Sequence, residues 1–126
     1  IVMGDLNDDP HDKSCSVNLG ASKEEKGVKP HGFYNPWWKI LDKGIGTLAY
    51  KGQWNLFDQI IVSGTLLKDN GADLYFHNAK VNNFDFLKDK EGNRENYPLR
   101  TYSAGRFLNG YSDHYPTEII LVKRKK

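Results

Sequence analysis

Residues 56–63, Leu-Phe-Asp-Gln-Ile-Ile-Val-Ser, decide the fold class of this chain. Side chains alternate between the two faces of a β-strand, so the even positions face one way and the odd positions the other. Both sets are largely apolar, which predicts a strand buried between two layers. Asp58 is the exception, because a carboxylate inside such a strand is costly unless it has a partner.

Further segments have the same strand character. In residues 118–122, Glu-Ile-Ile-Leu-Val, the odd and the even positions are again both largely apolar, so both faces of the strand are apolar. The chain offers few long helices to cover such strands twice, so we expect an α/β fold from which a covering layer is missing. We predict strands at 1–4, 47–53, 56–63, 73–81 and 118–122, and short helices at 13–19 and 36–41.

The composition excludes several classes of protein. The 126 residues suffice for one domain at most, and 38% hydrophobic with 27% charged residues argues against disorder. No apolar run approaches the ~20 residues of a membrane span, so we expect none. Cys15 is the single cysteine, which excludes a disulfide framework within the chain.

The net charge of +2 comes from the C-terminal end of the chain. Four of the 18 Lys and Arg residues lie at 123–126, and the remaining 14 are outnumbered by 16 Asp and Glu. Affinity for long duplex DNA depends on neutralising many phosphates. The body of the chain therefore does not favour a long duplex as its ligand.

Three acidic or histidine positions stand at strands or strand ends, where catalytic groups commonly lie. Asp5 ends the first strand, Asp58 lies within the middle strand, and Asp113-His114 precedes the last. A carboxylate bonded to a histidine fixes its tautomer, and a carboxylate at a strand end can orient water or bind Mg²⁺. Structural alternatives are a turn at Asp5 and Asn7, a backbone cap at Asp58 and a core histidine at position 114.

The order of three motifs resembles the second half of the endonuclease/exonuclease/phosphatase family. The motifs are Gly-Asp-Leu-Asn at 4–7 with Pro10, Phe-Asp-Gln-Ile at 57–60, and Tyr-Ser-Asp-His-Tyr-Pro at 111–116. The family includes deoxyribonuclease I-like nucleases, abasic-site endonucleases, neutral sphingomyelinases and inositol polyphosphate 5-phosphatases. The resemblance runs from Val2 to Val122, with Leu6 where Phe is common.

The resemblance implies half of a four-layer α/β sandwich of the deoxyribonuclease I type. We expect a mixed, mostly antiparallel sheet with a few short helices on one face. Residues 1–126 would form the C-terminal portion of a single domain, and the N-terminal half, which carries a metal-binding glutamate, would be absent from this chain. The missing half or a second copy would then cover the inner sheet face, and the chain alone would be nearly inactive.

The resemblance also implies roles for individual residues. Asp5 would orient or deprotonate the attacking water, and Asn7 would support the phosphate site. Asp58 would orient His114, which would stabilise the scissile phosphate. Asp113, with Asp5 and Asn7, would lie at the metal. The implied activity is hydrolysis of phosphate esters with Mg²⁺ or Mn²⁺.

The substrate and the compartment stay open from the sequence. We expect substrate contacts in the loop 97–111, from Arg100, Tyr102 and Arg106, to a nucleic acid or a small phosphorylated molecule. The alternative is a non-enzymatic binding module, because seven Tyr, three Trp and six Phe can line a groove. In that case Asp58 and Asp113-His114 would be unrelated in space. Both a cytoplasmic and an exported protein fit the sequence.

Overall fold

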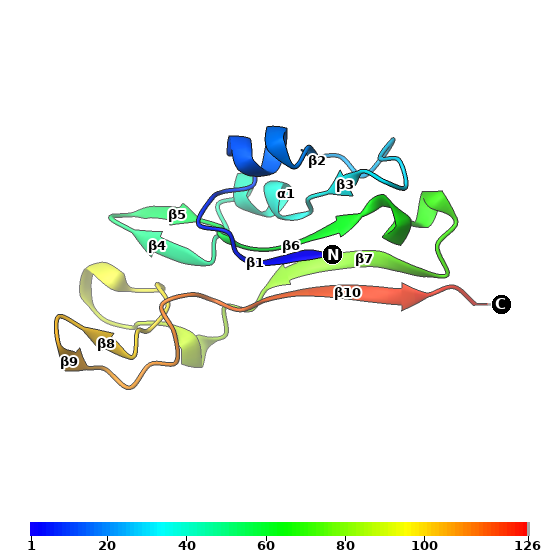
Figure 1. Cartoon of the computed structure of the whole chain (residues 1–126). Helices are drawn as coiled ribbons and strands as arrows, with labels where there is room; N and C mark the ends of the chain where they lie inside the picture. Colours follow the sequence, from blue (N-terminus) through cyan, green and yellow to red (C-terminus); the bar gives the residue numbers. More distant parts are fainter. Residues whose placement is uncertain (126) are drawn as a thin grey trace.

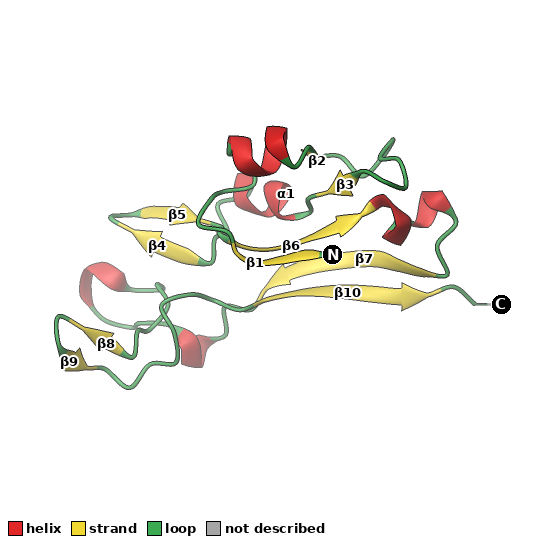
Figure 2. Cartoon of the chain, in the orientation of Figure 1, coloured by secondary structure: helices red, strands yellow, loops and turns green. Residues whose placement is uncertain are grey.

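The computed structural model describes residues 1–125 and shows a mixed α/β fold with several antiparallel sheets and few helices (Figures 1 and 2). The main sheet has the strand order β1-β6-β3-β2. The edge strand β1 pairs antiparallel with β6, with Asp5 directly opposite Asp58. The strands are β1 (Val2–Asp5), β6 (Asp58–Ser63), β3 (Phe33–Tyr34) and β2 (Ala21–Ser22).

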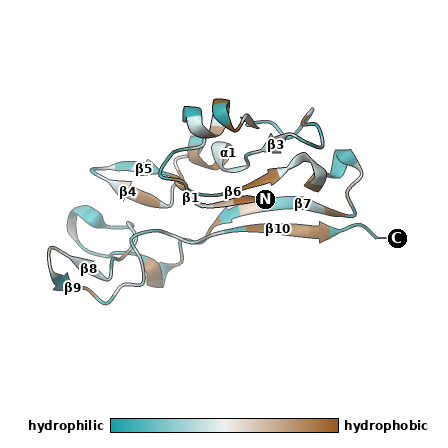
Figure 3. Cartoon of the chain, viewed as in Figure 1, coloured by the Kyte–Doolittle hydropathy of each residue, from teal (hydrophilic) through white to brown (hydrophobic). Residues whose placement is uncertain are grey.

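A second, two-stranded ribbon packs on one face of the main sheet, which we call the inner face. It consists of β7 (Leu74–Val81) and β10 (Thr117–Lys123), paired antiparallel with a bulge between Ile120 and Leu121. Val62 of β6, Phe76 of β7 and partly buried Ile119 belong to one apolar cluster. Figure 3 shows the hydrophobic residues of β6 and β10 that this packing uses.

Short helices cover the opposite, outer face of β6 (Figure 2). They are η1 (Ser14–Asn18) and α1 (Trp37–Asp42), which starts after Pro36. The Trp37 side chain is fully buried, and its indole Nε1 donates to the Ile60 carbonyl at 3.0 Å. Buried Gln59 accepts from the Asn35 amide at 2.7 Å and donates to the Asp8 carbonyl. The prediction that β6 lies between two layers is therefore confirmed.

The segment predicted as one strand at 47–53 is instead a hairpin. It forms β4 (Leu48–Tyr50) and β5 (Gln53–Asn55), joined through Lys51 and Gly52. Both turn residues have positive φ, 49° and 83°, as the turns of two-residue hairpins require. The single-strand prediction was wrong because it missed this turn.

The remaining elements are short and lie in the connections. These elements are η2 (Gly64–Leu66), η3 (Lys68–Asn70), η4 (Asp85–Leu87), η5 (Gly92–Arg94) and the hairpin of β8 (Tyr102–Ser103) with β9 (Arg106–Phe107).

None of the helices within residues 1–125 is long and apolar enough to cross a membrane.

Candidate active site

The pairing of β1 with β6 brings two carboxylates together on the inner face. Asp5 is the last residue of β1 and lies opposite Asp58, the first residue of β6. Like charges directly opposite one another destabilise an antiparallel pair. Each carboxylate therefore needs compensating partners, and the two carboxylates find different ones.

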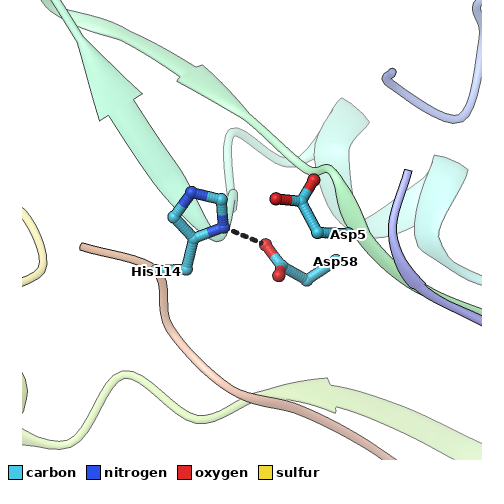
Figure 4. A group of neighbouring side chains, drawn as sticks. All are labelled: Asp5, Asp58 and His114. Carbon is cyan, nitrogen blue, oxygen red and sulfur yellow. Dashed lines mark hydrogen bonds and ion pairs between the residues drawn. The ribbon is translucent and has the colours of Figure 1, made fainter. Parts of the chain in front are cut away.

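His114 is the main partner of Asp58 (Figure 4). The imidazole Nδ1 lies 2.8 Å from Asp58 Oδ2, and each side chain is 22% exposed. A carboxylate on Nδ1 fixes the orientation of the ring and leaves Nε2 for another ligand. The juxtaposition of these two residues, 56 positions apart, matches the expectation from the sequence.

The chain around His114 is anchored by its neighbours. The backbone N–H of His114 donates to Ser112 Oγ at 3.1 Å, and that of Tyr115 donates to the Thr47 carbonyl at 2.7 Å. The Tyr115 hydroxyl donates to the Asn96 carbonyl at 2.9 Å, and burial raises the pKa of Tyr115 to about 12. Tyr115 therefore anchors the segment that carries His114 through both its backbone and its hydroxyl.

Thr47 is a site residue that the sequence did not reveal. Its hydroxyl donates to Asp58 Oδ2 at 2.5 Å, and its side chain is fully buried. The preceding Gly46 packs so closely on the hairpin that a Cβ there would collide with the Asn55 carbonyl oxygen. No local pattern marks Thr47, because only the fold brings it to Asp58, 11 positions along the chain.

Asp5 and Asn7 form a turn that holds the second carboxylate. Asp5 Oδ1 accepts from the Asn7 backbone N–H at 3.0 Å, and Asn7 adopts a φ of 53° in the left-handed region. Asn is among the few residues that tolerate this conformation and this bonding pattern. Within residues 1–125, no lysine or arginine pairs with Asp5, which is exposed and has a second oxygen free for a ligand.

The possible metal ligands where β1 and β6 meet suit a hard divalent cation. One ligand atom each of Asp5, Asp58 and His114 lie within 4.8 Å of one another. Mg²⁺ prefers oxygen ligands and is commonly held by one or two carboxylates with several waters. Asp58 Oδ2 already accepts from Thr47 and contacts His114, so Asp5 offers the freest carboxylate of the group.

Asp113 lies apart from this group, contrary to the position expected of a metal ligand. Its carboxylate is 3.7 Å from Nη2 of Arg100, and it is not among the three clustered residues. The two neighbouring side chains contact different partners. His114 contacts Asp58, and Asp113 contacts Arg100. This geometry therefore does not support the expected metal role of Asp113. Through its contact with Asp113, Arg100 lies beside the loop that carries His114, which we call the histidine loop.

Tyr102 and Arg106 lie on the hairpin of β8 and β9. Their side chains are exposed, and the Tyr102 ring packs against Phe107 with 5.2 Å between the centroids. The cavity that Asp58 and His114 share is lined by other residues. Arg100 does not line this cavity either, but it pairs with Asp113, the residue next to His114.

A carboxylate–histidine pair beside a second carboxylate at one rim of a sheet is an arrangement of hydrolases that activate water. The family model of the endonuclease/exonuclease/phosphatase family matches residues 1–123, and this chain belongs to that family. No curated protein and no solved structure matches the chain. Membership indicates a hydrolase of phosphate esters and agrees with the acidic cluster at the end of β1.

Proposed function

We propose that this chain carries part of the active site of a metal-dependent hydrolase of phosphate esters. The observation that supports it most is the Asp58–His114 hydrogen bond beside Asp5. Residues 1–126 form, in this proposal, the C-terminal portion of a single four-layer sandwich domain. Its sheets, helices and family membership are consistent with that architecture.

In this proposal the side chains divide the work between water and phosphate. Asp5 orients the attacking water and accepts its proton, because its outer oxygen is free. His114 presents Nε2, which donates to a phosphoryl oxygen when both ring nitrogens carry protons. Asp58 does not touch the substrate and acts as a positioning residue through Nδ1 of His114.

Asp5 and Asn7 are the residues that would hold the metal ion. Carboxylate and amide oxygens are suitable ligands for Mg²⁺ or Mn²⁺, and a cation would offset the repulsion between Asp5 and Asp58. Such an ion supplies charge that stabilises the developing negative charge on the phosphoryl oxygens.

The substrate class proposed is a phosphodiester or phosphomonoester, in a nucleic acid or a small molecule. Arg100 lies beside the histidine loop, where a guanidinium suits a phosphate oxygen. Tyr102 and Arg106 would reach only a larger substrate that extends to the hairpin of β8 and β9.

The test is hydrolysis of bis(p-nitrophenyl) phosphate and p-nitrophenyl phosphate by the complete protein encoded by the gene. We expect EDTA to lower the rate by about 10²-fold or more, and added Mg²⁺ or Mn²⁺ to restore it. Residues 1–126 alone should stay near background, because the family places a metal-binding glutamate in the first half of the domain. A rate insensitive to EDTA, or full activity of residues 1–126, would contradict the proposal.

The inner face beside β1 is the surface that we propose needs a cover. Ile1 and Met3 share this face with Asp5, and both side chains are exposed. Either the first half of the domain or a second copy would bury them. We expect residues 1–126 alone to self-associate in light scattering, and a stable monomer that does not bind a hydrophobic dye would contradict this.

A further inference from the structure

A cavity of about 440 Å³ opens beside the candidate active site. Asp58 and His114 line one part of it, and Phe84, Phe86 and Tyr111 line another. If a ligand phosphate binds at His114, the chemical group attached to that phosphate would therefore lie beside these aromatic rings. The metal and water chemistry proposed above makes no use of these three rings.

The three rings form one aromatic cluster at the cavity, which we call the corner. Phe84 and Phe86 are nearly parallel, with 5.8 Å between centroids and 8° between planes. Tyr111 stands almost perpendicular to Phe86, at 5.9 Å and 84°. All three side chains are exposed, although burial of such rings is favourable. The Lys80 ammonium lies 5.4 Å from the centroid of Phe84, so Phe86 and Tyr111 offer the freest apolar surface to a ligand.

Exposed aromatic rings distinguish between kinds of apolar group. A planar ring can stack on the face of Phe86 or Tyr111 or present its edge to it, and both arrangements are favoured between aromatic rings. A saturated ring or chain gains contact area but neither of these preferences. Stacking on aromatic side chains also tolerates many different planar groups.

The position of the corner links it to the reacting group. Phe86 lies in η4, and Tyr111 lies three residues before His114 in the same loop. A ligand that fills the corner therefore contacts the segment that carries the histidine. We propose that Phe84, Phe86 and Tyr111 form a specificity subsite for a planar aromatic group attached next to the phosphate. This inference rests on the proposed function and narrows its substrate class.

The experiment compares phenylphosphonate with cyclohexylphosphonate, whose P–C bonds resist hydrolysis. Both carry a ring of six carbons, and only the first ring is planar. We measure their binding, and that of inorganic phosphate, to the complete protein with Mg²⁺ by NMR titration. We expect phenylphosphonate to bind about five- to tenfold more tightly than cyclohexylphosphonate, the gain typical of one or two aromatic contacts.

Variants separate planarity from apolar contact. Phe86→Leu keeps an apolar side chain and should bring the preference to about one, without changing the affinity for inorganic phosphate. Tyr111→Leu gives a second test in an exposed loop if the first variant does not fold. Tyr50→Ala is the matched control, because Tyr50 is 64% exposed, like Phe86 at 63%, but lies on β4.

The outcomes distinguish this inference from the proposed function. If phosphate binding responds to His114→Ala but both phosphonates bind equally, or the preference survives Phe86→Leu and Tyr111→Leu, the subsite is wrong and the hydrolase proposal stands. If phosphate binding ignores His114→Ala, both proposals fail. With the preference established, adenosine 5′-monophosphate against ribose 5-phosphate, as competitors of phenylphosphonate, tells a nucleobase from a simple aryl group.

Discussion

His114→Ala is expected to lower kcat/KM for phosphate-ester hydrolysis by the complete protein about 10³-fold, and Asp5→Asn by a similar factor. In the proposed mechanism the first variant removes the donor to the phosphate, and the second removes the base, whose outer oxygen is free. Positioned acid–base groups and charge-stabilising donors are each worth about 10²–10⁴ in rate. Steady-state kinetics with saturating Mg²⁺ measures both effects.

Positioning residues should give a different kinetic pattern. Asp58→Asn keeps the shape of the side chain but weakens its hold on His114, and Thr47→Val removes the hydroxyl that donates to Asp58. We expect kcat to fall about 10²-fold and tenfold respectively, with KM nearly unchanged, since neither residue touches substrate in the proposed mechanism. Asp69→Asn, an exposed carboxylate on η3, is the control and should change nothing. Full activity of His114→Ala would remove the basis of the proposed mechanism.

The long strands were predictable because each has a strong local signal. The apolar residues at alternating positions in 56–63 and 118–122 identified β6 and β10. β6 carries buried core residues, whereas β10 packs partly buried Ile119 and Leu121 against the core and leaves Ile120 exposed, so burial on both faces holds only for β6. The three motifs identified the family and, through it, the neighbourhood of Asp5, Asp58 and His114. Strand ends and motif residues are positions where a few neighbours in sequence determine the chemistry.

Long-range partners could not be predicted in the same way. Thr47 contacts Asp58 only through the packing of the hairpin of β4 and β5, and Asp113 turns to Arg100 through a loop with no periodic pattern. The two-residue strands β2 and β3 lie beside a polar loop segment and have no pattern of their own. Such features depend on contacts between distant segments, which no short window of sequence contains.

The geometry also bears on the alternative of a non-enzymatic binding module. That interpretation requires Asp58 and the Asp113-His114 pair to be unrelated in space, whereas the imidazole of His114 is bonded to Asp58. The aromatic content that motivated it has a place beside the same site, in the walls of the cavity next to Asp58. The aromatic rings and the Asp58–His114 pair therefore lie in one region of this chain.

Asp9→Ala is expected to lower the free energy of unfolding by about 3 kcal/mol, a large effect for the loss of one polar side chain. Asp9 is buried, and its two oxygens accept from the Leu56 backbone N–H and the Asn55 side-chain amide, each at 2.6 Å. Alanine would leave the buried Leu56 N–H and the part-buried Asn55 amide without these partners. Denaturant unfolding of the complete protein, followed by the fluorescence of Trp37 and Trp54, measures the loss.

The adjacent Asp8 provides a matched control, because its carboxylate accepts from the Ser14 hydroxyl in an exposed setting. Asp8→Ala should cost about 0.5–1 kcal/mol, the value of an ordinary hydrogen bond. Equal losses for the two variants would show that the bonds of Asp9 stabilise the protein no more than one exposed hydrogen bond does. Leu56 lies two residues before Asp58, so Asp9 also fixes the start of β6. Hydrolysis by folded Asp9→Ala protein should therefore fall in kcat as well, whereas Asp8→Ala should retain it.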